Sequence, residues 1–197
     1  MCENILKRVN AGLRFLYRKQ GFLGFKERKM LYMSFLQPFL DYSCISWYSG
    51  LAKNYKHKLQ TAQNKAIRFV LKLDSRCHLT QLHFSRLSWL NVKHRVDFLA
   101  MNLMFKIYYG TAPLYMANQN LVRDVHGYNT RSNDMSYVIP HVKTNGLSSF
   151  RYLGTNLWNS LPNSIKQIQN HSMFKVQCKK HLIASMLNQE SSQFVYY

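Results

Sequence analysis

Residues 54–73 read NYKHKLQTAQNKAIRFVLKL, and this stretch sets the expectation for the whole fold. Its apolar side chains recur at helical spacing, at Leu59, Ala62, Ala66, Val70 and Leu73. Four basic side chains lie on the opposite side of the same helix, namely Lys58, Lys65, Arg68 and Lys72. Separation of apolar from charged positions at this period is typical of an amphipathic helix packed on a core. The stretch therefore predicts a long helix with a basic outer face.

Helical patterns also precede and follow this stretch. Residues 5–19 form one apolar face, made of Ile5, Leu6, Val9, Leu13 and Leu16. The opposite face carries Lys7, Arg14 and Arg18, and Gly21 and Gly24 end this helix. Further helices are expected at 26–37, where Pro38 ends or kinks the helix, at 79–84 and at 92–109, with a loop at 43–50. These patterns predict a mainly α protein whose residues 1–110 form a basic helical bundle.

The remaining chain is less regular. Residues 125–136 are polar and turn-rich, and residues 136–142 suggest a short strand that Pro140 interrupts. Residues 148–156 fit neither a helix nor a strand clearly. A short helix is expected at 161–168 with Pro162 in its first turn, and Ser172 is expected to cap a final helix at 173–187. We therefore expect a smaller, irregular C-terminal region at 111–187 and a frayed tail at 188–197.

Charge is the most unusual property of the composition. The 197 residues include 27 Lys and Arg against 8 Asp and Glu, a net charge of +19. Residues 1–110 hold 19 basic and 5 acidic side chains, and the rest hold 8 and 3. A folded domain with such an excess favours an anionic partner, which is usually nucleic acid, with an acidic membrane surface as the competitor.

The acidic residues and cysteines argue against catalysis and metal binding. The acids are dispersed singly, whereas two-metal phosphoryl transfer needs several that converge. Cys77, His78, His83 and His94 match no standard zinc spacing. We expect no catalytic residue, no metal site and no cofactor. Four scattered cysteines are typical of reduced thiols in an intracellular protein of the nucleus or cytoplasm. No signal peptide and no membrane span are expected, since no run of about 18 apolar residues occurs.

The basic faces are the candidate binding surface. The candidate phosphate-binding residues are Lys7, Arg14, Arg18, Lys58, Lys65, Arg68 and Lys72. The alternative is an ordinary solvated face, but such a face usually mixes acidic with basic side chains. Lipid binding by residues 5–19 is a minor alternative, because their apolar face is aliphatic and lacks Trp. Trp47, Tyr48 and Tyr55 flank the basic helix and offer rings on which bases could stack.

Several blocks of residues, in order, resemble the C-terminal part of non-LTR (LINE-type) retrotransposon polyproteins, of the jockey-like or chicken-repeat-like groups. They include Asp41-Tyr42, Gln63-Asn64-Lys65-Ala66-Ile67-Arg68, Tyr128-Asn129-Thr130-Arg131-Ser132 and Trp158-Asn159-Ser160-Leu161-Pro162. In that family a helical thumb follows the reverse transcriptase palm and grips the template–primer duplex. The resemblance implies a thumb-like bundle that binds an RNA–DNA hybrid or duplex by its backbone. It also implies that the palm and endonuclease active sites would lie upstream of Met1.

Three functional interpretations follow. The first is a catalytically inert fragment of an RNA-directed DNA polymerase that binds nucleic-acid backbone through its basic helix faces. The second is a protein-docking module, with a reverse transcriptase palm core as one possible partner, or a translated remnant without nucleic-acid affinity. The third is an enzyme whose dispersed acids converge in the fold.

Overall fold

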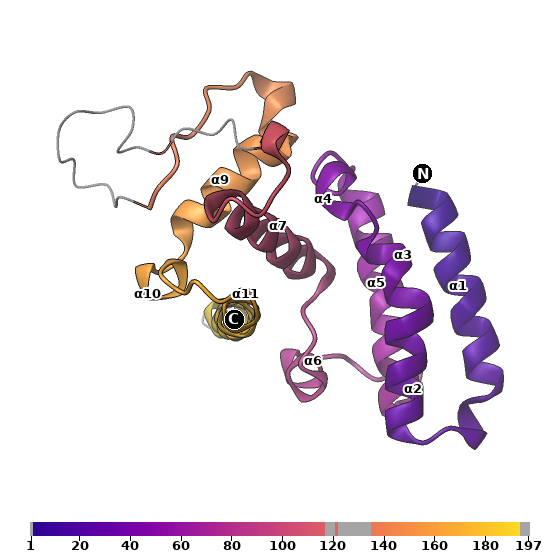
Figure 1. Ribbon diagram of the computed structural model, residues 1–197. Helices are drawn as coiled ribbons and strands as arrows, with labels where there is room; N and C mark the ends of the chain where they lie inside the picture. Colours follow the sequence, from indigo (N-terminus) through magenta and orange to yellow (C-terminus); the bar gives the residue numbers. More distant parts are fainter. Residues whose placement is uncertain (1, 117–120, 122–134, 194–197) are drawn as a thin grey trace. The chain divides into compact units, whose positions relative to one another are not determined.

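The computed structural model describes residues 2–116, 121 and 135–193 (Figure 1). The described residues are mainly helical, and their only β pairing is an isolated bridge between Leu121 and Tyr137. The expected mainly α fold is therefore confirmed. Two compact units are present: unit 1 comprises Met1–Arg95 with Met186–Tyr197, and unit 2 comprises Val96–Ser185. The division falls inside a helix and before Gly110, the boundary suggested by the sequence.

Two parallel helices of unit 1, α1 (Cys2–Arg18) and α5 (Lys53–Leu71), pack against each other. The Tyr55 hydroxyl donates to Glu3 Oε1 at 3.0 Å, and the Tyr17 hydroxyl donates to the Lys65 carbonyl at 2.8 Å. The N-terminal parts of α1 and α5 therefore lie side by side, and so do their C-terminal parts. The buried residues of α1 are those expected from the sequence, except that Ile5 is half-buried and Cys2, which was not expected, is buried.

The second helical stretch is longer than expected. It runs through α2 (Phe25–Leu31), the π-helical turn η2 (Tyr32–Leu36) and α3 (Gln37–Asp41) without a break. Pro38 lies in the first turn of α3 and does not end the helix. Proline has no N–H for an ordinary helical bond, and the wider π turn accommodates it: Gln37 N–H donates to the Tyr32 carbonyl, five residues back.

Shorter elements complete unit 1. The expected loop at 43–50 contains a helical turn, α4 (Cys44–Trp47), so that expectation was wrong in part. The short helix expected at 79–84 is α6 (Gln81–Leu87), and its capping box pairs Thr80 with His83. Helix α7 (Val92–Tyr108) starts in unit 1, where Asn91 Oδ1 accepts from the His94 N–H at 2.8 Å and caps it.

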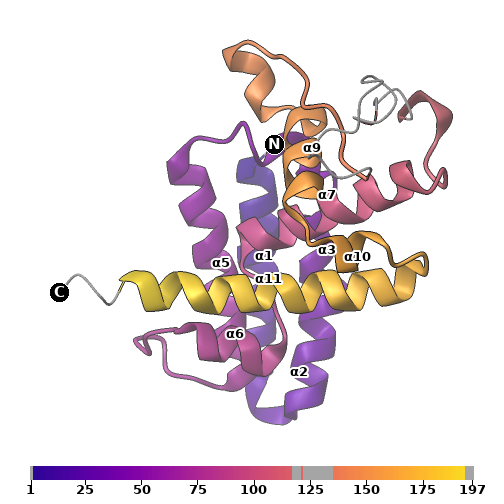
Figure 2. The same cartoon turned by 90° about the vertical axis from the view of Figure 1, so that its left-hand side faces the viewer.

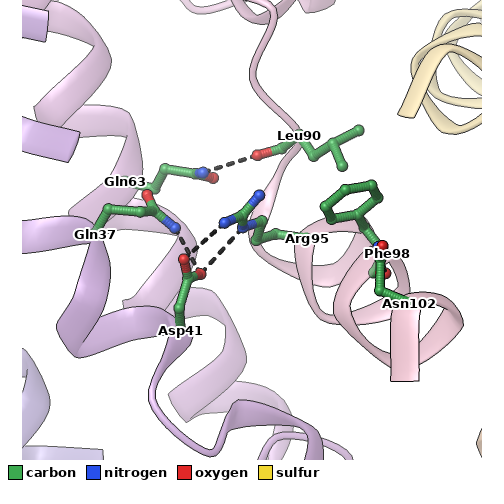
Figure 3. Close-up of polar contacts among 7 residues, drawn as sticks. All are labelled: Gln37, Asp41, Gln63, Leu90, Arg95, Phe98 and Asn102. Carbon is green, nitrogen blue, oxygen red and sulfur yellow. Dashed lines mark hydrogen bonds and ion pairs between the residues drawn. The ribbon is translucent and has the colours of Figure 1, made fainter. Parts of the chain in front are cut away.

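A polar cluster fixes the end of α3 (Figure 3). Arg95 donates from Nε and Nη2 to the two carboxylate oxygens of Asp41, at 3.1 and 2.8 Å. Gln37 also donates to Asp41, at 2.8 Å. Gln63, which is 2% exposed, donates to the Leu90 carbonyl at 2.8 Å. Asp41 and Gln63 belong to the sequence blocks singled out above, and their contacts here are structural.

Unit 2 is built from the rest of α7, α9 (Phe150–Ser160), α10 (Asn163–Lys166) and most of α11 (His171–Gln193), which Figure 2 shows along its length. Short 3-10 turns occur at η3 (Leu114–Met116) and η4 (Thr144–Ser148), and η1 (Gln20–Phe22) is a similar turn in unit 1. Aromatic rings form the core of unit 2. The Phe105 and Phe174 ring centroids are 4.5 Å apart, and those of Phe174 and Trp158 are 6.1 Å apart.

Trp158 and Asn159 hold an extended segment against α9. Trp158 Nε1 donates to the Met135 carbonyl at 2.8 Å. The Asn159 side chain accepts from the Tyr137 N–H at 3.0 Å and donates to the Tyr137 carbonyl at 2.8 Å. The expected strand at 136–142 does not form in the described chain: Tyr137 has an isolated bridge to Leu121, and its own N–H and carbonyl bond the Asn159 side chain.

Three boundaries in the C-terminal region also differ from expectation. Pro162 precedes α10 as its N-cap, and Asn170, not Ser172, caps α11: its Oδ1 accepts from the Ser172 and Met173 N–H groups. Helix α11 continues to Gln193, so residues 188–193 of the expected frayed tail are helical. Gly110 ends α7 as expected, with a φ of +67° that favours glycine. Residues 122–134, with the Tyr128–Ser132 block, and residues 194–197 lie outside the described residues.

Candidate nucleic-acid interface

Two rows of cations run along the parallel pair α1 and α5. Lys58 and Lys65 are seven residues apart, close to two helical turns, so they line one side of α5, and Lys72 follows at the same interval just beyond the helix. At 1.5 Å per residue this row extends about 21 Å. Lys7 and Arg14 repeat the seven-residue spacing on α1, and Arg18 follows one turn later. Because the helices run parallel and in contact, the two rows run in the same direction.

The six residues of these two rows are solvent-exposed, and we call them the basic track: Lys7, Arg14, Arg18, Lys58, Lys65 and Lys72. Lys58 Nζ stands 5.3 Å from the centre of the Tyr55 ring, a cation–π contact. Lys72 lies just beyond α5, in the left-handed conformation with φ 55°, so the helix ends two residues before the expected Leu73. Glu3 is the one carboxylate in the sequences of α1 and α5, and it accepts the Tyr55 hydroxyl.

Arg68 differs from the other six candidates. It is half-buried, and both Nε and Nη2 donate to the Cys77 carbonyl, at 3.1 and 3.0 Å. These bonds hold the segment after α5 against the helix. Arg68 thus has a structural role that the basic pattern alone did not indicate, and charge reversal there would disturb the fold as well as any binding.

Other cations of unit 1 also bind carbonyl oxygens. Arg28, 8% exposed, donates to Val70 and Leu23, Lys29 donates to Leu87, and Lys56 donates to Ser49. Val70 lies in the last turn of α5 and Leu87 is the last residue of α6, where carbonyls lack helical partners and the helix dipole favours positive charge. Part of the net charge of +19 therefore stabilises the fold. Sequence reasoning missed these roles because Val70 and Leu87 are distant in the chain, and because a bond to a backbone carbonyl leaves no mark in the side-chain pattern.

The aromatic residues near the track are engaged within unit 1. Trp47 Nε1 donates to the Tyr42 carbonyl at 3.0 Å, and the Trp47 and Tyr48 rings pack edge to face. Lys56 Nζ lies 5.4 Å from the centre of the Tyr48 ring. Tyr55 contacts both Glu3 and Lys58. These contacts favour packing roles, and they make base stacking by these rings a weaker hypothesis than backbone binding by the track.

The candidate metal and thiol residues lie in ordinary structural contacts. Across the described residues, no three His, Cys, Asp or Glu side chains come together as metal ligands would. His83 Nδ1 accepts from the Thr80 N–H at 3.1 Å as part of the α6 cap. Burial raises the pKa of the Cys44 thiol to about 12, with the Asp41 carboxylate as a second cause, and burial does the same for Cys178. Such thiols are poor nucleophiles.

The wider comparisons add no relative. No family model, curated protein sequence or solved structure matches this chain. None of the described helices combines the length and the apolar character that crossing a membrane requires.

Proposed function

We propose that unit 1 binds the backbone of double-stranded nucleic acid through the basic track, without sequence readout. The observation that carries this proposal is the alignment of six exposed cations in two rows on parallel helices. The one carboxylate of these helices is Glu3, which lies at the N-terminal end of α1 and is hydrogen-bonded to Tyr55. A surface of one sign raises the local concentration of an anionic ligand.

The dimensions of the track suit a duplex. Duplex DNA carries one charge per about 1.7 Å of axis, so the 21 Å lysine row runs beside about a dozen phosphates. Lysine and arginine contacts to phosphate give affinity and orientation but do not read bases.

The ordered blocks described above support a narrower proposal. The chain is a catalytically inert fragment of a retrotransposon RNA-directed DNA polymerase, with unit 1 as a thumb-like module and an RNA–DNA hybrid or duplex as its ligand. An intracellular location in the nucleus or cytoplasm follows from that role. The dispersal of the eight acids supports inertness, because phosphoryl transfer needs converging carboxylates.

A titration of the full chain against an RNA–DNA hybrid, duplex DNA and heparin, across a salt series, tests the proposal. Tighter binding to the hybrid than to heparin, with affinity that falls steeply with salt, is the expected result. Equal binding to all three polyanions would show a generic basic surface and refute a duplex-binding track. Absence of binding to all three would favour the docking or remnant interpretation.

A further inference from the structure

An apolar groove in unit 1 is separate from the basic track. It lies between α1 and the stretch α2–η2–α3 and has a volume of about 650 Å³. Phe15 and Phe35 line it and remain 59% and 64% exposed, while Leu36 is buried against Gly12 beneath them. A second hollow of about 480 Å³ shares Arg8 and Phe39 with this groove and continues it along α1. Apolar surface of this kind on a folded domain marks an interaction site.

The length of the groove matches a short helix. Arg8 and Lys19 both line it and are eleven residues apart on or just after α1, which is about 16 Å or three helical turns. Grooves between two helices commonly take the apolar face of a third, which inserts side chains at i, i+3 or i+4, and i+7. Phe15, Leu23, Leu31 and Phe35 offer apolar walls for such side chains.

The charges around the groove select the chemistry of its occupant. Arg8 and Lys19 are the charged side chains that line it, and no carboxylate lines either hollow. The Arg8 guanidinium stands 5.7 Å from the centre of the Phe39 ring. A partner with carboxylates about three turns apart places one beside each cation, because opposite charges across an interface fix register and increase the association rate.

We propose that this groove binds an amphipathic helix of another protein that carries an apolar stripe flanked by acidic residues. A second copy of this chain is disfavoured, because each copy carries a charge of +19. A lipid surface is also disfavoured. The apolar residues here line a concave groove, whereas Phe22, which protrudes with 89% exposure, lies outside it.

The test uses a fluorescent designed peptide of five helical turns with leucines at i, i+3, i+7 and i+10 and glutamates at i−1 and i+11, which lie about three turns apart. Fluorescence anisotropy with the full chain should show saturable binding. The double variant Phe15→Ser/Phe35→Ser should bind on the order of a hundredfold more weakly, since each phenylalanine contributes apolar burial. Phe22→Ser is the matched control and should bind as the wild type does. Arg8→Gln/Lys19→Gln should bind several-fold more weakly, as expected for exposed ion pairs.

Three results would overturn the proposal. One is equal affinity for a control peptide with lysines in place of the glutamates. Another is binding of phosphatidylserine vesicles, but not of the peptide, that requires Phe15 and Phe35; this would indicate a lipid surface. The third is concentration-dependent self-association that Phe15→Ser/Phe35→Ser abolishes, which would indicate a second copy. Circular dichroism verifies that each variant is folded, and Lys58→Gln/Lys65→Gln/Lys72→Gln should leave peptide binding unchanged, because those lysines lie outside the groove.

Discussion

Replacement of Arg28 by methionine should destabilise unit 1 without altering the basic track. Arg28 Nε donates to the Val70 carbonyl at 3.0 Å, and Nη1 donates to the Leu23 carbonyl at 2.6 Å. The side chain is 8% exposed, and among the described contacts its partners are these two carbonyls and no carboxylate. Methionine fills a similar volume but leaves both carbonyls without this donor.

The expected magnitude follows from these two bonds. A hydrogen bond to a charged group contributes roughly 1.5–3 kcal/mol, and removal of the buried charge recovers part of its desolvation cost. We therefore expect the free energy of unfolding to fall by about 3 kcal/mol. With a urea dependence of about 2 kcal/mol per molar, the midpoint should fall by about 1.5 M. Arg28→Lys should lose about half as much, since it retains the charge but has one donor nitrogen in place of the two that donate here.

Urea unfolding of the full chain, followed by circular dichroism, measures this change. Lys26→Met is the matched control on the same helix, because Lys26 is exposed and should change stability by no more than about 0.5 kcal/mol. The reasoning fails if Arg28→Met is as stable as the control, since the two carbonyl contacts would then contribute nothing.

Three further predictions test other parts of the structure. Burial, and secondarily Lys93, lowers the pKa of His94 below its usual 6.5. The neutral ring therefore stabilises the fold above pH 6.5, and this contribution is lost as the pH falls towards the folded-state pKa. His94→Gln should flatten this pH dependence of stability in urea titrations. Cys77 is the half-exposed cysteine and should react with Ellman's reagent well before the three buried ones, a fast phase that Cys77→Ser removes. Asn159→Asp should destabilise unit 2 by about 1–3 kcal/mol in thermal melts, because a carboxylate cannot donate to the Tyr137 carbonyl, whereas Ser160→Ala should cost less.

Local patterns predicted the long helices well. The spacing of Leu6, Val9, Leu13 and Leu16 identified the buried face of α1, because a regular helix on a core repeats its apolar positions. Pro38 misled, since the rule that proline breaks helices does not foresee a π turn that accommodates it. Residues 136–142 misled for a different reason. A short strand was expected there, but the N–H and carbonyl of Tyr137 bond the side chain of Asn159.

The candidate interface was predicted in part. Helical spacing placed Lys58 and Lys65 on one exposed side of α5, and a repeat of seven residues can be seen in the sequence alone. The charge pattern alone could not distinguish the structural arginines Arg68 and Arg28 from the exposed lysines. Their bonds to the Cys77 and Val70 carbonyls depend on how the chain folds back. The apolar groove also escaped prediction, since it arises from the packing of two helices and not from either alone.

The salt dependence of binding to an RNA–DNA hybrid tests the central claim most directly. The two proteins to compare with wild type are Lys58→Gln/Lys65→Gln/Lys72→Gln and the charge-matched control Lys26→Gln/Arg86→Gln/Lys93→Gln, whose residues are exposed elsewhere in unit 1. Each phosphate contact contributes about 0.9 to the magnitude of the slope of log affinity against log salt. Loss of three contacts should therefore reduce the magnitude of this slope by about 2.7 in the track variant, and the control should keep nearly the wild-type slope. Equal losses in both variants would contradict the claim, since they would show that net charge and not the track governs binding.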